Sequence, residues 1–319
     1  MSKSITSDVP QAADEQHGTN RRGFLKCGVW AGTGVAWIMS GGIPRSMSLD
    51  LVDTALADAA SFSFVQISDS HIGFNKAPNP DPVATFRQGL QRIKSLPTQP
   101  AFMIHTGDVS HLSKPDEFDT AEQIIGESGF ETHYVPGEHD ILIDDGKPFF
   151  ERFSKSADGW YSFDQNGVHF IALVNVLGFK SGGFGHLGEE QLAWLQRDLM
   201  AQSASTPIVV FTHIPLWMVY DKWGWGTDDA AQAMSYLKPF GSVTVLNGHI
   251  HQVIQKIEGT VSFHTAYSTA YPQPAPGTAP NPGPMKVDAG RLKSLLGIRD
   301  VNSLSTTQPL AIIDTPLSA

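Results

Sequence analysis

The chain has 319 residues, of which 41% are hydrophobic and 17% charged, and its formal net charge is −10. This composition is typical of a globular protein with a packed core and excludes a chain that is disordered throughout. The acidic balance argues against nucleic-acid binding, because proteins hold phosphate backbones with an excess of Lys and Arg.

The first 59 residues differ from the rest of the chain. Arg21-Arg22 precede an apolar run from Cys27 to Met39, and small residues suited to cleavage follow near positions 55–59. This pattern resembles a twin-arginine export signal. A single-pass anchor is the alternative, but about 13 apolar residues fall short of the ~20 that cross a bilayer. We therefore expect residues 1–59 to be a removable signal read by the twin-arginine export machinery, and the protein to be periplasmic or otherwise exported without a stable membrane anchor.

Cys27 is the only cysteine in the chain, and it lies within this segment. The rest of the chain has no thiol, so disulfides and thiolate metal ligands are excluded there. Any metal ion would have to be held by histidine and carboxylate side chains.

From residue 60 onward, short apolar runs rich in Val, Ile and Phe alternate with helical patterns. The runs predict strands over residues 62–68, 101–106, 132–136, 168–175, 207–212 and 243–247, with a last strand over 310–314. The helical patterns cover residues 83–95, 115–128, 188–202 and 229–237. Asn166-Gly167 predicts a hairpin turn because both positions accept a positive φ, and Glu258-Gly259-Thr260 suggests a second hairpin.

The alternation of strands and helices indicates an α/β sandwich with both parallel and antiparallel strands. No internal repeat or second domain is evident, so we expect residues 60–319 to form a single domain. The proline-rich stretch 271–284 disfavours helix and central strand, and we expect it to be an extended surface segment.

Potential metal ligands follow five of the predicted strands. The clusters are Asp69-Ser70-His71, Gly107-Asp108, Gly137-Glu138-His139-Asp140, Thr212-His213 and Gly248-His249-Ile250-His251. Ligands bind at the carboxyl ends of strands in open α/β sheets, because loops from several strands converge there. The glycine before Asp108, Glu138 and His249 would let the backbone turn tightly enough to direct each side chain inward.

In this order, the five clusters resemble the signature of the calcineurin-like metallophosphoesterases, over residues 69–251. The resemblance implies an α/β protein with a four-layer α/β/β/α sandwich of mixed sheets, and two metal ions per chain (Fe, Mn or Zn). It also implies the ligands. One ion would be held by Asp69, His71, Asp108 and His251, and the other by Asp108, Glu138, His213 and His249, with Asp108 as the bridge.

The activity implied by the resemblance is hydrolysis of a small phosphate diester or monoester. Two ions about 3.5–4 Å apart bind substrate oxygens and lower the pKa of a bridging water, and the resulting hydroxide attacks phosphorus. His139 would then donate a proton to the leaving oxygen or stabilise charge there. Asp140 would orient the imidazole of His139 through a hydrogen bond.

Glu138 departs from the family pattern, which has Asn at this position. Together with Asp69 and Asp108 it would place three ionised carboxylates at the centre. Two divalent ions and a hydroxide would then be neutral overall, which weakens attraction for phosphate dianions and favours tighter metal binding. Either Glu138 replaces Asn as an oxygen ligand, or the second site is altered and the protein binds metal or phosphate without turnover.

Residues near these ligands are weaker candidates for substrate binding. Trp217, Trp223 and Trp225 follow His213 and could form an exposed wall that stacks an aromatic or sugar group, although the same loop could pack on itself. His111, three residues after Asp108, could also contact substrate.

Overall fold

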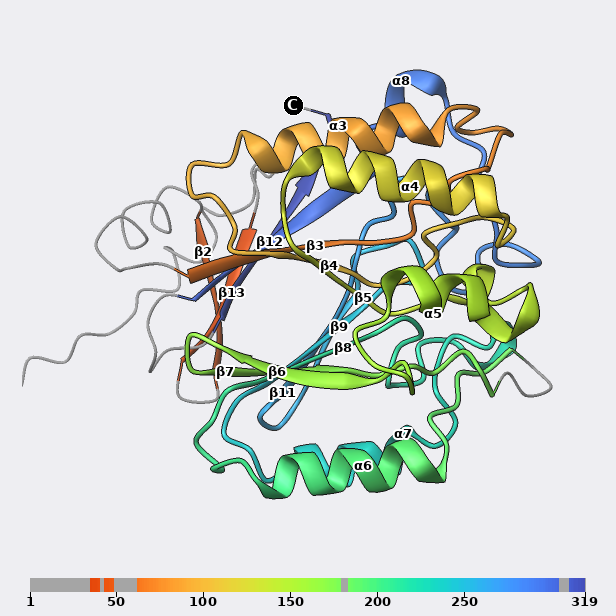
Figure 1. The fold of residues 1–319 in the computed structure, drawn as a ribbon. Helices are drawn as coiled ribbons and strands as arrows, with labels where there is room; N and C mark the ends of the chain where they lie inside the picture. The colour runs from red at the N-terminus through yellow and green to blue at the C-terminus, as the bar shows by residue number, and fades with distance from the viewer. Residues whose placement is uncertain (1–34, 41–42, 49–61, 179–182, 304–309, 319) are drawn as a thin grey trace, which may run out of the picture. The chain divides into compact units, whose positions relative to one another are not determined.

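The computed structural model describes residues 35–40, 43–48, 62–178, 183–303 and 310–318 (Figure 1). The strands in this part of the chain form two sheets. In spatial order, the first sheet contains β2 (Ile43–Ser48), β1 (Val35–Ser40), β13 (Leu310–Pro316), β12 (Gly297–Ser303), β3 (Phe62–Ile67), β4 (Met103–His105) and β5 (Thr132–Tyr134). The second contains β10 (Gln255–Glu258), β11 (Val261–Thr265), β9 (Val243–Asn247), β8 (Ile208–Thr212), β7 (Val168–Ala172) and β6 (Tyr161–Gln165).

Both sheets are mixed, as the sequence predicted. In the first sheet β3, β4 and β5 are parallel, whereas β12, β13, β1 and β2 pair in antiparallel fashion. In the second sheet β7, β8, β9 and β11 are parallel, and the edge strands β6 and β10 are antiparallel. The parallel blocks align the carboxyl ends of several strands in each sheet.

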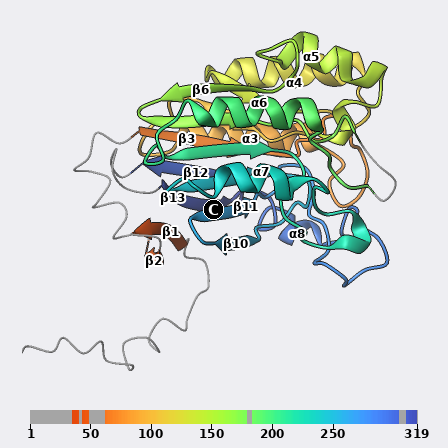
Figure 2. The same ribbon diagram turned by 90° about the horizontal axis from the view of Figure 1, so that it is seen from below.

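Helices cover the outer face of each sheet. α3 (Pro82–Lys94) and α4 (Pro115–Ser128) pack on the first sheet together with α5 (Lys147–Phe153) and α8 (Ala289–Leu292) (Figure 1). α6 (Glu189–Met200) and α7 (Ala230–Leu237) lie side by side over the second sheet (Figure 2). The layers are therefore α/β/β/α, which confirms the four-layer prediction.

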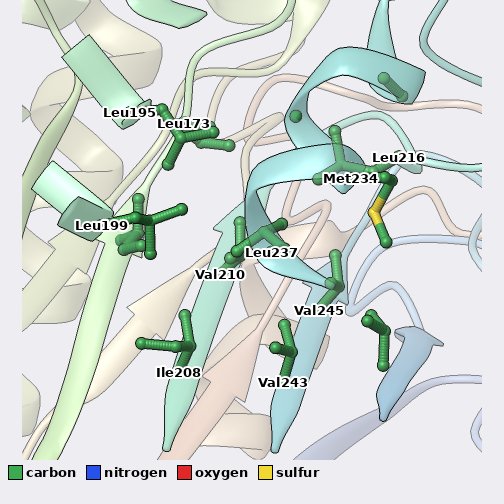
Figure 3. Packing of buried hydrophobic residues seen from close by; sticks show 14 of the residues in the cluster. Leu173, Leu195, Leu199, Ile208, Val210, Leu216, Met234, Leu237, Val243 and Val245 are labelled. Carbon is green, nitrogen blue, oxygen red and sulfur yellow. The ribbon is translucent and has the colours of Figure 1, made fainter. Parts of the chain in front are cut away.

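Strand periodicity explains why three apolar cores separate the four layers. In β3, Phe64 joins the cluster between the sheets whereas its neighbour Val65 faces α3 and α4. Likewise Val209 of β8 points to the other sheet and Val210 points to α6 and α7, beside Leu237 and Val245 (Figure 3). Alternate side chains of a strand leave opposite faces, so a strand covered on both sides is apolar throughout. Burying each such Val or Phe stabilises the fold by roughly 1.5–3 kcal/mol.

The predicted hairpins are present. Asn166 and Gly167, with φ of 49° and 76°, connect β6 to β7, and Gly259 with φ of 63° lies between β10 and β11. The sequence analysis did not predict β12 or α5. β12 has no continuous apolar run by which to predict a strand, because it contains the buried polar residues Arg299 and Asn302.

β1 and β2 lie within the segment that the sequence assigned to an export signal. β1 pairs with β13 through Ala36↔Ile313 and Trp37↔Ile312. The Arg21-Arg22 pair and the suggested cleavage region at 55–59 lie outside the described residues. Within the described ranges, no helix is long and apolar enough to cross a membrane.

Candidate metal centre

The ligand-bearing loops of the two sheets meet at the carboxyl ends of their parallel strands. The backbone N–H of Asp69, after β3, donates to Gly107 O at 3.0 Å, which ties together the loops that follow β3 and β4. Gly248 N–H, after β9, donates to His213 O at 3.0 Å, after β8. The two pairs are joined across the sandwich by His249 N–H, which donates to Asp69 Oδ1 at 3.0 Å. The fifth cluster joins them through the backbone N–H of His139, which donates to Asp108 Oδ1 at 2.9 Å, so all five converge on one place.

The backbone at these ligands is strained. Asp69, His71, Asp108, His249 and His251 have φ of 53°, 40°, 52°, 71° and 51°, in the left-handed region that disfavours side chains. They make up five of the nine described non-glycine residues with positive φ. Such strain persists only where the surrounding structure enforces it, and it concentrates at functional sites. The observation supports a functional role for these five residues independently of their chemistry.

The glycines beside the ligands serve two different purposes. Gly107 has φ of 93°, and a Cβ there would also approach His213 Nδ1 to 2.5 Å. Gly137, by contrast, is extended with φ of −97°, but a Cβ would collide with the side chain and backbone of Asp108. The prediction that glycine allows a tight backbone turn therefore holds for Gly107. At Gly137, glycine is needed because there is no room for a side chain beside Asp108.

The four residues expected to hold the first ion form one buried group. Asp69, His71, Asp108 and His251 place one ligand atom each within 4.8 Å of all the others. His71 Nε2 lies 3.2 Å from His251 Nε2 and 3.4 Å from Asp108 Oδ2. His251 Nε2 lies 3.3 Å from Asp69 Oδ1.

The second expected set also gathers. Glu138, His213 and His249 form a group within the same 4.8 Å limit, with Glu138 Oε2 2.8 Å from His213 Nε2 and Glu138 Oε1 3.0 Å from His249 Nδ1. Asp108 lies between the two groups, because its Oδ2 is 3.5 Å from His213 Nε2 as well as 3.4 Å from His71 Nε2. This is the position that a bridging carboxylate requires.

Hydrogen bonds to main-chain carbonyls set the orientation of three imidazoles. Nδ1 of His213 donates to Thr106 O, Nδ1 of His251 to Tyr271 O and Nδ1 of His139 to His111 O, each at 2.6 Å. Because a carbonyl can only accept, these bonds place the proton on Nδ1 and leave a lone pair on Nε2 in the neutral ring. A carbonyl behind the ring is the usual support of a metal-ligating histidine.

The donor set fits two hard or borderline cations. It offers carboxylate oxygens and imidazole nitrogens without thiolate, as suits Zn, Mn or Fe. Asp69 Oδ2 is buried and has no hydrogen-bond partner among the described residues, so a cation would satisfy it. The described residues thus have the chemistry for a two-ion centre, and ligation itself stays a prediction.

Charges within the centre shift several pKa values. Burial opposes ionisation of Glu138, yet His249 and His213 hold the pKa of Glu138 well below its ordinary value. Burial also opposes the protonation of His213, but the Asp108 and Glu138 carboxylates raise the pKa of His213 well above the usual range. For His71, burial and the neighbouring His139 both lower the pKa, so this ring is neutral. A cation can therefore bind His71 directly, whereas it must displace a proton from His213.

His139 lies beside the centre, as predicted, but Asp140 does not orient it. Both oxygens of Asp140 accept backbone hydrogen bonds, from Val109 and Gly137 at 3.0 Å and from Ser110 at 2.8 Å. The predicted contact between Asp140 and the His139 imidazole is therefore wrong. Asp140 holds the loop after β4 against the 3₁₀ turn Glu138–Asp140, and the carbonyl of His111 orients His139.

His111 lies next to His139 and His71. Its ring stacks on that of His139 with centroids 4.9 Å apart, and its Nδ1 is 3.3 Å from Nδ1 of His71. Burial, followed by the charge of His139, lowers the pKa of His111 to about 4. The structure thus places a neutral, half-buried imidazole at the edge of the centre, and substrate contact by His111 stays a prediction.

The exposed tryptophan wall does not form. Trp225 is only 1% exposed, and Trp217 packs in the core between the second sheet and its helices, against Phe263. Trp223 is partly exposed and packs edge-on against Trp225. The loop packs on itself because Val219 N–H and Tyr220 N–H both donate to Trp225 O, which folds Trp225 inward.

The sequence analysis missed the segment 268–273. Tyr271 is buried, its ring stacks on His71 with centroids 4.8 Å apart, and its hydroxyl lies 3.2 Å from His71 Nε2. Ser268 Oγ donates to Asp69 O, and the Gln273 side chain donates to His249 O. The expectation that the stretch from residue 271 is a surface segment is therefore wrong for Tyr271.

Comparison with known proteins agrees with this geometry. Residues 62–253 match the family model described as calcineurin-like phosphoesterase. A serine/threonine-protein phosphatase of Danio rerio, CPPED1, is 28% identical over 180 residues, which cover 49% of this chain and 58% of that protein. A 3',5'-cyclic-nucleotide phosphodiesterase of Nostoc is 23% identical over 213 residues, 65% of this chain and 78% of that protein.

A solved structure shows the same fold. The crystal structure of a dimetal phosphatase from Danio rerio superposes with a TM-score of 0.53 at 15% identity, over 66% of this chain and 88% of that chain. The family match spans more than half of this chain and contains every predicted ligand from Asp69 to His251. The chain therefore belongs to the calcineurin-like phosphoesterase family.

Proposed function

We propose that the protein hydrolyses small phosphate esters with two bound metal ions. The observation that carries this proposal is the position of Asp108 Oδ2, 3.4 Å from His71 Nε2 in one ligand group and 3.5 Å from His213 Nε2 in the other. Two ions at such a centre would supply Lewis-acid activation of water and of the phosphoryl oxygens. The remaining chemistry falls to the side chains around them.

His139 is the candidate proton donor. Its Nδ1 is engaged by His111 O, so Nε2 remains to exchange a proton with the leaving oxygen. Burial lowers the pKa of His139, but Asp108 and Glu138 outweigh it and raise the pKa above its ordinary value. The carboxylates therefore favour the protonated ring, which is the form that a general acid needs.

We infer that diesters are better substrates than monoesters. Three carboxylates, Asp69, Asp108 and Glu138, face the centre and neutralise much of the charge of two divalent ions. A diester monoanion tolerates this better than a monoester dianion, because it depends less on a positive field. The relative from Nostoc, named as a cyclic-nucleotide phosphodiesterase, supports the same preference.

Turnover of bis(p-nitrophenyl) phosphate and p-nitrophenyl phosphate with Mn, Fe and Zn tests this proposal. We expect hydrolysis of both, a higher kcat/KM for the diester, and loss of both activities in Asp108→Asn but not in the remote control Asp164→Asn. Tight binding of two metal ions per chain, without turnover of either substrate with Mn, Fe or Zn, would contradict the enzyme proposal. That outcome would leave the second candidate function, a metal- or phosphate-binding protein whose second site is altered by Glu138.

We also propose that residues 1–59 direct export through the twin-arginine machinery and that the mature protein is periplasmic. The support is the sequence pattern around Arg21-Arg22. Removal of residues 1–59 would take β1 and β2 away and leave β13 as an edge strand, while β12 and β3 remain paired. N-terminal sequencing of the exported protein, compared with an Arg21→Lys/Arg22→Lys variant that stays in the cytoplasm, tests this. An intact N-terminus together with export of the double variant would contradict it.

A further inference from the structure

Tyr271 places a phenolic oxygen within hydrogen-bond distance of His71, a member of the first ligand group. Its hydroxyl lies 3.2 Å from His71 Nε2. That nitrogen is also 3.2 Å from His251 Nε2 and 3.4 Å from Asp108 Oδ2. The phenol is therefore as close to His71 Nε2 as two of the residues expected to bind the same ion.

These separations are those of atoms that share one cation. Ligand atoms about 2.1 Å from an ion and 90–109° apart lie about 3.0–3.4 Å from one another. The phenolic oxygen meets this spacing from His71. We propose that Tyr271 Oη is an additional ligand of the first metal ion, beside Asp69, His71, Asp108 and His251. This proposal rests on the metal centre of the proposed function.

The surrounding contacts hold the phenol in this position. Ser268 Oγ accepts from Tyr271 N–H at 3.1 Å and donates to Asp69 O at 2.8 Å, so the segment is tied to the loop of one expected ligand. Tyr271 O accepts from His251 Nδ1 at 2.6 Å, which ties it to another. The ring packs against His71 and Phe74, with centroids 4.8 and 4.5 Å away. The hydroxyl is thus positioned in advance, which lowers the entropy cost of binding a cation.

Coordination by Tyr271 would change the character of the first site. The phenolic proton passes to solvent on binding, and the first ion then has three anionic oxygen ligands, from Asp69, Asp108 and Tyr271. Hard anionic oxygens favour hard cations and raise the preference for a higher charge. The first site would therefore be selective for a harder ion than the second, which has Glu138, His213 and His249 in addition to the bridge.

Metal titration of the full-length, metal-free protein tests the proposal. Zn²⁺ does not absorb in the near ultraviolet, so a phenolate difference band that develops with the first equivalent reports a coordinated tyrosine. We expect this band in the wild type and in the control Tyr236→Phe, whose hydroxyl lies on α7, away from the centre, and accepts from the Gln232 side chain. We expect Tyr271→Phe to lose the band and to bind the first Zn²⁺ at least about tenfold more weakly by calorimetry. Tyr271→Phe preserves the stacked ring and the carbonyl that supports His251, which keeps the test specific for the oxygen.

Two outcomes separate this inference from the proposed function. If the band is absent from the wild type, or Tyr271→Phe retains both the band and the affinity, the phenol is not a ligand even where phosphoesterase turnover is normal. If the band and the affinity loss appear while no phosphate ester is hydrolysed, Tyr271 is a ligand and the enzymatic proposal fails.

Discussion

Oε2 of Glu138 lies 2.8 Å from Nε2 of His213, where the family pattern has a neutral amide. The contact places a negative charge in the second ligand group. Two consequences are expected of its removal. Glu138→Asn should bind the second ion about tenfold or more weakly, because one charged donor becomes neutral. It should also raise kcat/KM for p-nitrophenyl phosphate relative to the diester, because the field at the centre becomes more positive.

Metal analysis after dialysis and the two hydrolysis assays measure these effects of Glu138→Asn, with the exposed Glu131→Gln as the control. Unchanged metal occupancy and unchanged rates would show that Glu138 is only a substitute oxygen ligand.

Replacement of His139 by Gln should separate proton transfer from metal binding. General-acid catalysis contributes typically about 10²–10⁴-fold to rate. We expect a loss in this range for esters of an aliphatic alcohol, and a much smaller loss for p-nitrophenyl esters, whose leaving oxygen needs no proton. Metal content should be unchanged by elemental analysis. Equal losses for both leaving groups would argue that the His139 side chain acts on metal binding and not on the leaving oxygen. The backbone N–H of His139, which donates to Asp108 Oδ1 at 2.9 Å, is retained in the variant.

His169 should make stability depend on pH. Its Nδ1 and Nε2 lie 2.7 Å from Asp164 and 2.8 Å from Asp198, which link β6, β7 and α6. Burial lowers the pKa of His169, but the two carboxylates raise it overall above the ordinary value of 6.5. Because the folded pKa is raised, the stabilisation is complete below the unfolded pKa and is lost as pH rises through the folded pKa.

We therefore expect His169→Gln to lose about 1 kcal/mol of unfolding free energy, measured by urea denaturation, at about pH 5.5, and to lose less at about pH 9. Asp164 should contribute little to this loss because its side chain is exposed. His133→Gln is a control of opposite sign. Burial lowers the pKa of His133 to about 4, below that of the unfolded ring, so protonation of the unfolded state costs the wild type stability at about pH 5.5. The stability of the wild type relative to His133→Gln should therefore rise between about pH 5.5 and about pH 9. A wild-type advantage over His169→Gln that grows with pH would contradict the assignment.

Trp225 should matter for stability and not for substrate affinity. Its side chain is 1% exposed, and truncation of such a residue leaves a cavity. Trp225→Ala should cost roughly 3–5 kcal/mol of unfolding free energy, whereas Trp225→Phe should fold and retain the KM of each substrate. A several-fold rise in KM for the folded Trp225→Phe variant would instead support a role of Trp225 in substrate binding.

Much of the fold and most of the centre could be predicted from sequence because both depend on local patterns. Apolar strands such as residues 243–247 have the composition of strands buried on both faces, and the structure has β9 at those same bounds. The expected ligands, including Asp69, Asp108 and His213, directly follow such strands, and parallel strands align their carboxyl ends. The gathering of these residues was therefore decided by chain order and strand periodicity.

The tertiary structure decided what these residues contact, because those partners come from distant parts of the chain. The backbone amides around Asp140 divert its carboxylate from His139, and Trp225 turns inward because its carbonyl closes a local turn. Tyr271 has no ligand motif in the sequence, yet β11 and the loop after it carry its hydroxyl to His71, 200 residues earlier in the chain. Sequence by itself determined which groups could hold a metal ion, since that follows from chemical type and position after a strand. Only the tertiary structure determined which further groups lie next to these candidate ligands, because that depends on how the two sheets meet.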